Sequence, residues 1–158
     1  MGVLQPLMGD VTRLPDRFFL GGPLQLRGFR TKGLGPRAKI DGKGFDAAGA
    51  KGGDAYFAAG AAITTMLPSQ ALQAVNARLH AFANCGNNVA ISQRRGQGGS
   101  RSDGSGELFE KARCVLGVGV VLPLQNMRVE VNYCWAVRAY RELGDRLARW
   151  QVGIGFES

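Results

Sequence analysis

Histidine, cysteine and long apolar runs are scarce in this chain of 158 residues, and each shortage removes a class of function. A single histidine, His80, leaves little material for a histidine-based catalytic or metal site. The three cysteines, Cys85, Cys114 and Cys134, do not have the spacing of zinc ligands, and as an odd, widely spaced set they predict free thiols. No run of about 18 apolar residues is present, which excludes a transmembrane helix.

A contiguous basic stripe is also missing, although the net charge is +8. The surplus of Lys and Arg falls in residues 9–54, 94–113 and 138–149, where acidic residues are interspersed. A nucleic-acid surface more often shows a contiguous basic stripe with aromatic platforms. We therefore expect no nucleic acid among the partners of this chain.

The sequence also lacks the usual signs of an enzyme. No catalytic triad can be built around His80, and no cluster of residues with metal-ligand spacing occurs. The glycines of residues 96–106 do not lie between a strand and a helix, as a phosphate-binding loop requires. We expect no enzymatic activity, no metal and no cofactor.

Apolar and polar residues alternate with a period of two in several segments, which predicts β-strands. The strongest segment covers residues 127–137, and residues 75–84, 114–122 and 149–156 follow the same pattern. Residues 55–67 also alternate, but their many alanines leave a helix possible. Residues 85–106 are expected to form a loop, and Pro123 to end the strand before it. The chain is predicted to be all-β, with about five antiparallel strands.

This alternation fits two architectures. In a soluble β-sandwich the apolar faces form the core, whereas in a membrane barrel they face lipid and the polar or small faces line the lumen. The predicted strands are long enough to cross a bilayer, which takes about 9 to 11 tilted residues. The polar faces carry Arg78, His80, Arg128 and Glu130, as in a wet lumen, and the apolar faces carry Tyr133, Trp135 and Trp150, as in an aromatic girdle. The pattern alone does not decide between them.

Residues 9–53 precede the strands and predict a long loop without sustained periodicity. A loop of this length is unusual in a compact domain and is often functional. It contains a bend signal, Gly21-Gly22-Pro23, followed by Arg27-Gly28-Phe29, which places an arginine in an apolar frame. If that arginine is buried, it needs an acidic, amide or carbonyl partner.

Three motifs resemble one known family. Residues 20–29 (Leu-Gly-Gly-Pro-Leu-Gln-Leu-Arg-Gly-Phe), followed by Gly-Leu-Gly-Pro at 33–36, are similar to the sixth-loop signature of the BamA-like barrel assembly proteins. Residues 82–87 and 130–134 resemble strand motifs of the mitochondrial branch of that family, the barrel subunits of the sorting and assembly machinery. The resemblance runs from about residue 18 to the end of the chain.

The resemblance implies that residues 1–158 are the C-terminal part of a sixteen-stranded transmembrane antiparallel β-barrel of the bacterial-surface-antigen type. Residues 9–53 would be a long loop folded into the lumen, and residues 54–158 the last strands. An incomplete set of strands requires a longer barrel, because an open sheet edge is not tolerated in lipid. The expected location is the mitochondrial outer membrane.

The implied function is the insertion and assembly of β-barrel precursor proteins, templated at the seam between the first and last strands. The implied partners are unfolded β-barrel precursors, other subunits of the sorting and assembly machinery and the lipid bilayer. Two alternatives remain: another BamA-like translocation barrel, from a plastid envelope or a bacterial outer membrane, and a soluble β-rich binding domain.

The resemblance also assigns candidate site residues. The loop motif comprises Gly21, Gly22, Pro23, Arg27, Gly28 and Phe29. Arg27 is implied to reach into the lumen, where Asn84 and Glu130 are its candidate partners; Glu130 is chosen because alternation places it on a polar face. The seam strand comprises Arg149, Trp150, Gln151, Val152, Gly153, Ile154, Gly155 and Phe156. Its end is similar to the targeting signal of mitochondrial barrel proteins, except that Ser158 stands at the final hydrophobic position.

Overall fold

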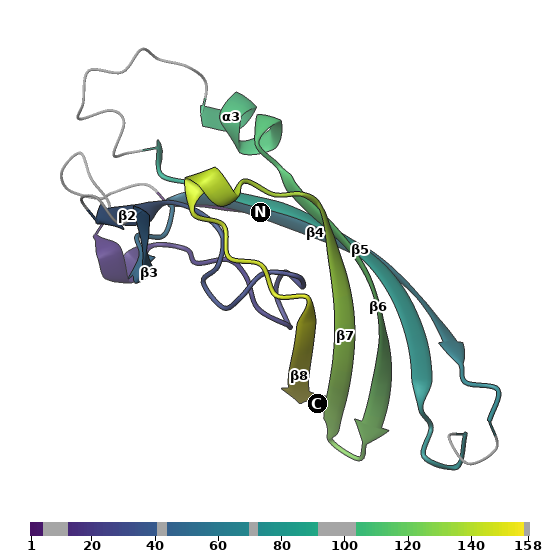
Figure 1. Cartoon of the computed structure of the whole chain (residues 1–158). Coiled ribbons are helices and arrows are strands. Elements are labelled where there is room, and N and C mark those ends of the chain that lie inside the picture. Colours follow the sequence, from purple (N-terminus) through teal and green to yellow (C-terminus); the bar gives the residue numbers. More distant parts are fainter. Residues whose placement is uncertain (5–12, 41–43, 70–72, 92–103, 157–158) are drawn as a thin grey trace.

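Six antiparallel strands form one curved sheet in the computed structural model, which describes residues 1–4, 13–40, 44–69, 73–91 and 104–156. In the order of the sheet they are β1 (Gly2–Val3), β4 (Ala55–Met66), β5 (Arg78–Val89), β6 (Arg113–Leu124), β7 (Met127–Arg138) and β8 (Trp150–Phe156). The sheet curls like part of a barrel wall (Figure 1). The remaining elements are the ribbon of β2 (Arg37–Ile40) and β3 (Gly44–Ala50), helix α3 (Gly104–Glu110), and the 3-10 turns η1 (Leu14–Asp16) and η2 (Arg141–Leu143).

The period-two pattern predicted the central strands because one face of each is apolar and the other is polar or small. The segment predicted over residues 55–67 is a strand and not a helix, since β4 (Ala55–Met66) pairs with β5 along its whole length, from Ala55↔Val89 to Met66↔Arg78. The turn at Gln125-Asn126 joins β6 to β7, with Gln125 in the left-handed region (φ 42°).

The expected loop over residues 85–106 is wrong at both ends. β5 continues to Val89, and α3 begins at Gly104, while residues 92–103 lie outside the described part of the chain. Asn87 and Asn88 resembled turn residues in the sequence, but their side-chain amides bind neighbouring elements instead. Asn87 Nδ2 donates to the Leu108 carbonyl (2.8 Å) and Asn88 Nδ2 to the Phe18 carbonyl (2.8 Å).

The expected number of about five strands is confirmed by β4 to β8, and the two residues of β1 add a short sixth strand beside β4. Two smaller expectations need correction. Residues 9–53 contain η1, β2 and β3 and are therefore not without secondary structure. Pro123 does not end β6, which continues to Leu124; it lies beside the hairpin turn, near the strand end where a missing N–H is tolerated.

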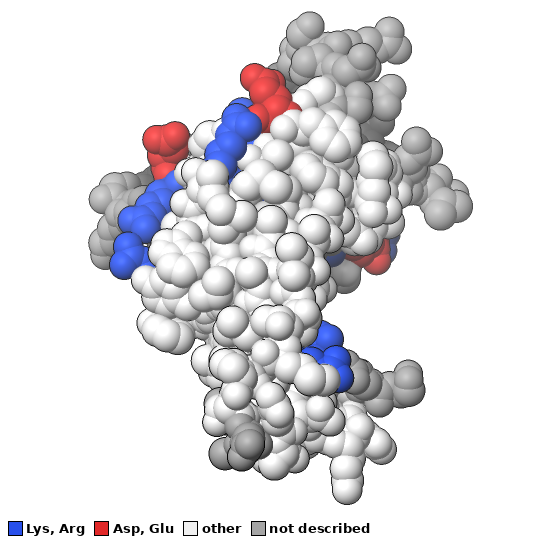
Figure 2. Space-filling view, turned by 90° about the vertical axis from the view of Figure 1, so that its right-hand side faces the viewer, with Lys and Arg blue, Asp and Glu red and all other residues white. Residues whose placement is uncertain are grey.

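The apolar faces of the strands point outward, away from the loop. Exposed large apolar side chains come from β4 to β8 and include Ile63, Leu79, Leu116, Val118, Val131, Trp135, Val152 and Phe156. Figure 2 shows a broad surface free of charge, with Lys, Arg, Asp and Glu at its margins. This arrangement is that of a membrane barrel wall and the reverse of a soluble sandwich, in which these side chains would form the core. No helix in the described part of the chain has the length and apolar character needed to span a membrane.

The core lies on the concave side, between the sheet and the loop. Leu20, Leu26, Phe29 and Leu34 of the loop pack on inward-facing side chains of three strands, Phe82 (β5), Val115 (β6) and Cys134 (β7). Phe29 and Leu26 are fully buried there, with 0% and 1% of their surface exposed. The loop therefore fills the space that a barrel lumen occupies, and apolar burial stabilises its position.

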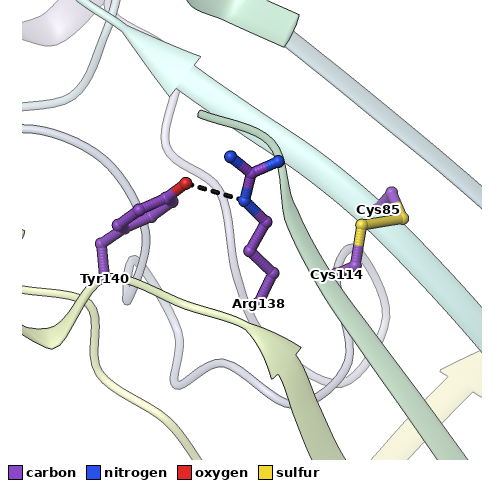
Figure 3. Close-up of a disulfide and its surroundings, with 4 residues drawn as sticks. All are labelled: Cys85, Cys114, Arg138 and Tyr140. Carbon is purple, nitrogen blue, oxygen red and sulfur yellow. Dashed lines mark hydrogen bonds between the residues drawn. A yellow bond between two sulfur atoms is a disulfide. The ribbon is translucent and has the colours of Figure 1, made fainter. Parts of the chain in front are cut away.

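The prediction of three free thiols is wrong for two of the cysteines. Cys85 of β5 and Cys114 of β6 are joined by a disulfide (Figure 3). Their separation of 29 residues gave no hint of this, but the sheet places them directly opposite each other, with Cα atoms 4.2 Å apart. Cys134 is a buried free thiol.

Candidate functional site

The candidate site is built around residues 20–34, called here the inward loop. Two isolated bridges, Leu20↔Leu34 and Gly22↔Leu26, fold it back on itself, and the Gly22 N–H donates to the Phe29 carbonyl (3.0 Å). Gly28 adopts a positive φ of 87°, and a Cβ there would lie 2.5 Å from Val115 Cγ1 of β6. Glycine is therefore required at this position both by the backbone conformation and by the close approach to the sheet.

Arg27 and Glu130 form a bidentate ion pair between the inward loop and β7. The Arg27 Nε donates to Glu130 Oε1 (3.1 Å) and Nη2 to Oε2 (2.8 Å). The side chain of Glu130 is 1% exposed and that of Arg27 is 19% exposed. A planar guanidinium binds a carboxylate in this fork geometry with high directional specificity, so the pair fixes both the position and the orientation of the loop tip.

Phe82 of β5 supports the other side of the same guanidinium. The Arg27 Cζ lies 5.0 Å from the centre of the Phe82 ring, within the range of a cation–π contact. Asn84, the other candidate partner of Arg27, lies elsewhere on the concave face. Its amide oxygen is beside Gly60 of β4, 2.5 Å from where a Cβ on that glycine would be. In the described part of the chain, both hydrogen bonds of the Arg27 side chain go to Glu130.

Gln151 of β8 binds the backbone of the Arg-Gly-Phe motif. Its Oε1 accepts from the Gly28 N–H (2.7 Å), and its Nε2 donates to the Phe29 carbonyl (2.6 Å). The side chain is buried, so these bonds satisfy polar groups that have little access to water. The single side-chain amide of Gln151 on β8 thus binds backbone groups of two consecutive loop residues.

The residues just before β8 also pair with the inward loop. Backbone bonds run from Ala148 N to Gly28 O (2.9 Å), from Arg30 N to Arg146 O (2.9 Å) and from Arg146 N to Gly33 O (2.8 Å). Phe29 and Leu147 form an isolated antiparallel bridge in the middle of this set. The loop therefore behaves as a short extra strand against residues 146–148.

Glycines at inward positions of the strands make room for these contacts. A Cβ on Gly153 of β8 would lie 3.1 Å from the Cβ of Pro23 and 3.0 Å from Glu130 Cγ. A Cβ on Gly119 of β6 would collide with the His80 and Asn132 side chains, which hydrogen bond across it (2.6 Å). Because these glycines have no side chains, side chains from neighbouring elements can contact each other above β6 and β8.

Part of this site was not predicted from the sequence. Gln151 was placed in the seam strand, but its bonds to the loop were not foreseen; the available signal was its inward position in the alternation of β8. Phe82 was likewise not singled out, although it is an aromatic residue on a polar strand face. The structure brings together Arg27, Glu130, Gly28, Phe29 and Gln151, whereas Asn84 is not part of this group.

The contacts of the site are suited to holding the inward loop in one position. They are one ion pair, one cation–π contact and directed hydrogen bonds. Within the described residues, no group of three or more His, Cys, Asp or Glu side chains is arranged to hold a metal ion. The arrangement joins the inward loop to β7 and β8 at once.

Comparisons with known proteins bear on the family and the fold of this chain. The model of the Omp85 superfamily domain matches residues 1–157. The sorting and assembly machinery component 50 homologues of Bos taurus and Homo sapiens are 34% and 33% identical over 98% of this chain. The sorting assembly machinery 50 kDa subunit of Saccharomyces cerevisiae is 33% identical over 89% of the chain. The chain spans about a third of the length of the two mammalian relatives (32%) and 26% of the yeast protein.

A solved structure shares the fold. The crystal structure of BamA from Haemophilus ducreyi, lacking POTRA domains 1–3, superposes with a TM-score of 0.67 at 18% sequence identity. The match covers 90% of this chain and 27% of that one. The curved sheet is therefore part of a β-barrel.

Proposed function

The chain belongs to the Omp85 superfamily, and from this membership we propose that it takes part in the insertion and assembly of β-barrel precursor proteins in an outer membrane. Its relatives in cattle, humans and yeast are named as components of a sorting and assembly machinery. By analogy, its partners are other subunits of such a machinery, unfolded β-barrel precursors and the bilayer, and its location is the mitochondrial outer membrane. We propose no catalytic role for its side chains.

The observation that carries this proposal is the simultaneous attachment of the inward loop to the last two strands. Arg27 binds Glu130 on β7, and Gln151 on β8 binds the backbone at Gly28 and Phe29. Among the described residues, β8 is the terminal strand of the sheet, so one of its edges has no neighbour there. An unpaired strand edge is a template for an incoming strand.

In this mechanism the docked loop keeps β8 extended and in register, and the precursor pairs with its free edge. The side chains of β8 suit a lipid-facing edge, because Trp150, Val152, Ile154 and Phe156 point outward. The inward side is small at Gly153 and Gly155, which leaves room for the loop tip. In this proposal, β8 and the inward loop that supports it act together.

The test is the substitution Arg27→Ala in the natural full-length protein, followed by measurement of precursor insertion and of barrel abundance. Insertion is expected to slow more than abundance falls, because the loop loses its ion pair while the apolar core remains. Arg30→Ala is the matched control, since Arg30 is an exposed cation of the same loop. Normal insertion by the Arg27→Ala protein would contradict the proposal.

A further inference from the structure

A second buried ion pair lies at the end of the sheet where β6 begins. Arg113 Nε is 3.0 Å from Asp145 Oδ2, and the two side chains are 5% and 0% exposed. The same carboxylate oxygen accepts from the Tyr140 N–H (2.8 Å), and the Arg113 guanidinium lies 5.2 Å from the Tyr140 ring centre. Arg113 Nη1 also donates to Asn87 Oδ1 of β5. These contacts attach residues 139–149, called here the lead-in segment, to β5 and β6.

The lead-in segment connects this ion pair to the inward loop. Asp145 is followed at once by Arg146, whose backbone N–H and carbonyl both bind the loop, at Gly33 and Arg30. The next contact is Ala148 to Gly28. The position of Asp145 therefore determines where residues 146–148 meet the loop.

This arrangement draws the lead-in segment away from β7. β7 continues to Arg138, but its strand pairing with β8 ends at Tyr133↔Trp150. Among the described residues, one further backbone bond follows, from Cys134 N to Arg149 O (2.8 Å). A cavity of about 620 Å³ lies in the gap, with Trp135, Ala136, Leu147 and Ala148 among its lining residues. Continuing the register of the ladder by four residues would instead place Val137 opposite Arg146.

We propose that Arg113 and Asp145 are positioning residues for β8: their ion pair holds the lead-in segment on the inward loop and prevents it from pairing with the end of β7. The inference rests on the proposed function, because it names the residues that keep loop and last strand together. Without Arg113, the fully buried Asp145 carboxylate has lost its charged partner and cannot remain in place at low cost. In the longer β8, the same register would put Asp145 opposite Arg138, which offers a replacement cation.

The test is a cross-link that forms only in the longer ladder. Val137→Cys and Arg146→Cys are introduced together into the natural full-length protein in lipid vesicles, and the two thiols are oxidised to a disulfide by copper–phenanthroline. Peptides linked between these positions are quantified by mass spectrometry over time. Adding Arg113→Ala is expected to raise the rate of cross-linking at least about tenfold, because the lead-in segment is released. Adding Arg113→Lys, which keeps the positive charge, is expected to give a rate below that of Arg113→Ala.

Arg138→Ala is the matched control. Arg138 lies at the same end of the sheet and is exposed. Its Nε donates to the Tyr140 hydroxyl (2.7 Å), as Figure 3 shows. The Arg138 Cζ also lies 5.6 Å from the centre of the Tyr140 ring, which Arg113 contacts as well. Its removal should not raise the rate, because it leaves Asp145 paired with Arg113.

An unchanged rate with Arg113→Ala, or an equal rise with Arg138→Ala, would overturn the inference. If the Arg113→Ala protein fails to fold, Asp145→Asn decides in its place, since it removes the charge but keeps an acceptor for Tyr140; no rise there also overturns the inference. Precursor insertion is measured in the same preparations. Faster cross-linking with unchanged insertion would keep the positioning role and contradict the proposed function, whereas unchanged cross-linking overturns the positioning role whatever insertion does.

Discussion

The two members of the Arg27–Glu130 pair differ in burial, and this difference has a measurable consequence. The Glu130 side chain is 1% exposed, so it depends on Arg27 for its counter-charge. Arg27 is 19% exposed and also contacts the Phe82 ring, so it retains some water and one favourable neighbour if Glu130 is neutralised. Stranding a buried charge is the larger of the two costs.

Arg27→Met is therefore expected to destabilise the protein more than Glu130→Gln. Removing one member of a buried pair costs about 3–5 kcal/mol, and Arg27→Met should lie towards that range because the carboxylate is left without its partner. Glu130→Gln keeps the shape of the side chain and should cost less. The measurement is the urea midpoint of each variant in detergent micelles. Equal midpoints, or a lower one for Glu130→Gln, would refute this asymmetry.

Gln151 provides a second prediction for single side chains. Gln151→Glu keeps an acceptor for the Gly28 N–H but loses the donor to the Phe29 carbonyl, and it brings two oxygens together. Each lost hydrogen bond is worth about 0.5–1.5 kcal/mol, so the loop should open roughly tenfold more often.

Limited proteolysis of the inward loop measures this opening. Both Gln151→Glu and Gln151→Ala should be cleaved faster than the unmodified protein. Val152→Ala is the control, because this neighbour is 63% exposed on the outward face. Cleavage of Gln151→Glu at the unmodified rate would show that the amide does not hold the loop.

Among the elements, β6 acts as a spacer between β5 and β7. Its inward positions Gly117 and Gly119 have no side chains, so Phe82 of β5 lies over Gly117 and His80 meets Asn132 of β7 over Gly119. Contacts across the lumen-facing surface thus skip one strand. A β-branched or larger residue at these positions would force the neighbours apart.

Gly119→Ala is expected to destabilise the sheet by about 1–3 kcal/mol, because the new methyl group must displace both the His80–Asn132 bond and the Val131 carbonyl. Gly155→Ala on β8 is the matched control, since the nearest atom to a Cβ there is 3.7 Å away. Thermal unfolding followed by gel mobility compares the two. The prediction fails if both variants unfold at the same temperature.

Much of the element pattern could be predicted from the sequence because the strand faces differ so strongly in polarity. The apolar rows of β7 and β8 each occupy one face, as the alternation indicated, and the same alternation placed Glu130 on the opposite, polar face. That the apolar face points outward was implied by the resemblance and not by the alternation. Helix α3 and the continuation of β5 were missed, since Asn87 and Asn88 are typical turn residues and only their partners in other elements show otherwise.

The long-range contacts of the site could not be predicted in the same way. An inward position for Gln151 does not reveal which backbone groups it faces, 122 and 123 residues away. The Cys85–Cys114 bond and the Arg113–Asp145 pair depend on register and on the path of the lead-in segment. The periodicity of the sequence determines which face of a strand a side chain occupies, whereas the residue that it contacts depends on the three-dimensional fold.

At the scale of the whole molecule, the polarity of the curved sheet indicates its surroundings. Apolar side chains cover the outer face, on which Figure 2 shows a broad surface free of charge. The loop lies on the concave side (Figure 1), together with the buried polar residues of the strands. An aromatic cluster on the outer face consists of Tyr133, Trp135 and Trp150. The ring centre of Tyr133 lies 4.6 Å from that of Trp135 and 4.8 Å from that of Trp150. Aromatic residues of this kind mark the lipid interface of barrels.

Trp135 and Trp150, 50% and 69% exposed, are therefore expected to contact lipid. Their fluorescence in vesicles should be quenched by phospholipids brominated along the acyl chain. In the natural protein, the quenched fraction should fall when Trp135→Phe and Trp150→Phe are combined. Quenching of the two tryptophans by aqueous iodide but not by brominated lipid would contradict an outer face in contact with the bilayer.

The central claim is that the Arg27–Glu130 pair, formed on β7, keeps the inward loop docked against the neighbouring strand β8. A covalent link between the loop and β8 tests this claim most directly. A Cβ on Gly153 would lie 3.1 Å from the Pro23 Cβ, close enough for a disulfide after a small shift. The pair Pro23→Cys and Gly153→Cys, added to Arg27→Ala, should restore precursor insertion when oxidised and lose it again on reduction. If the cross-link forms and insertion stays as slow as in Arg27→Ala alone, holding the loop on β8 is not what Arg27 contributes.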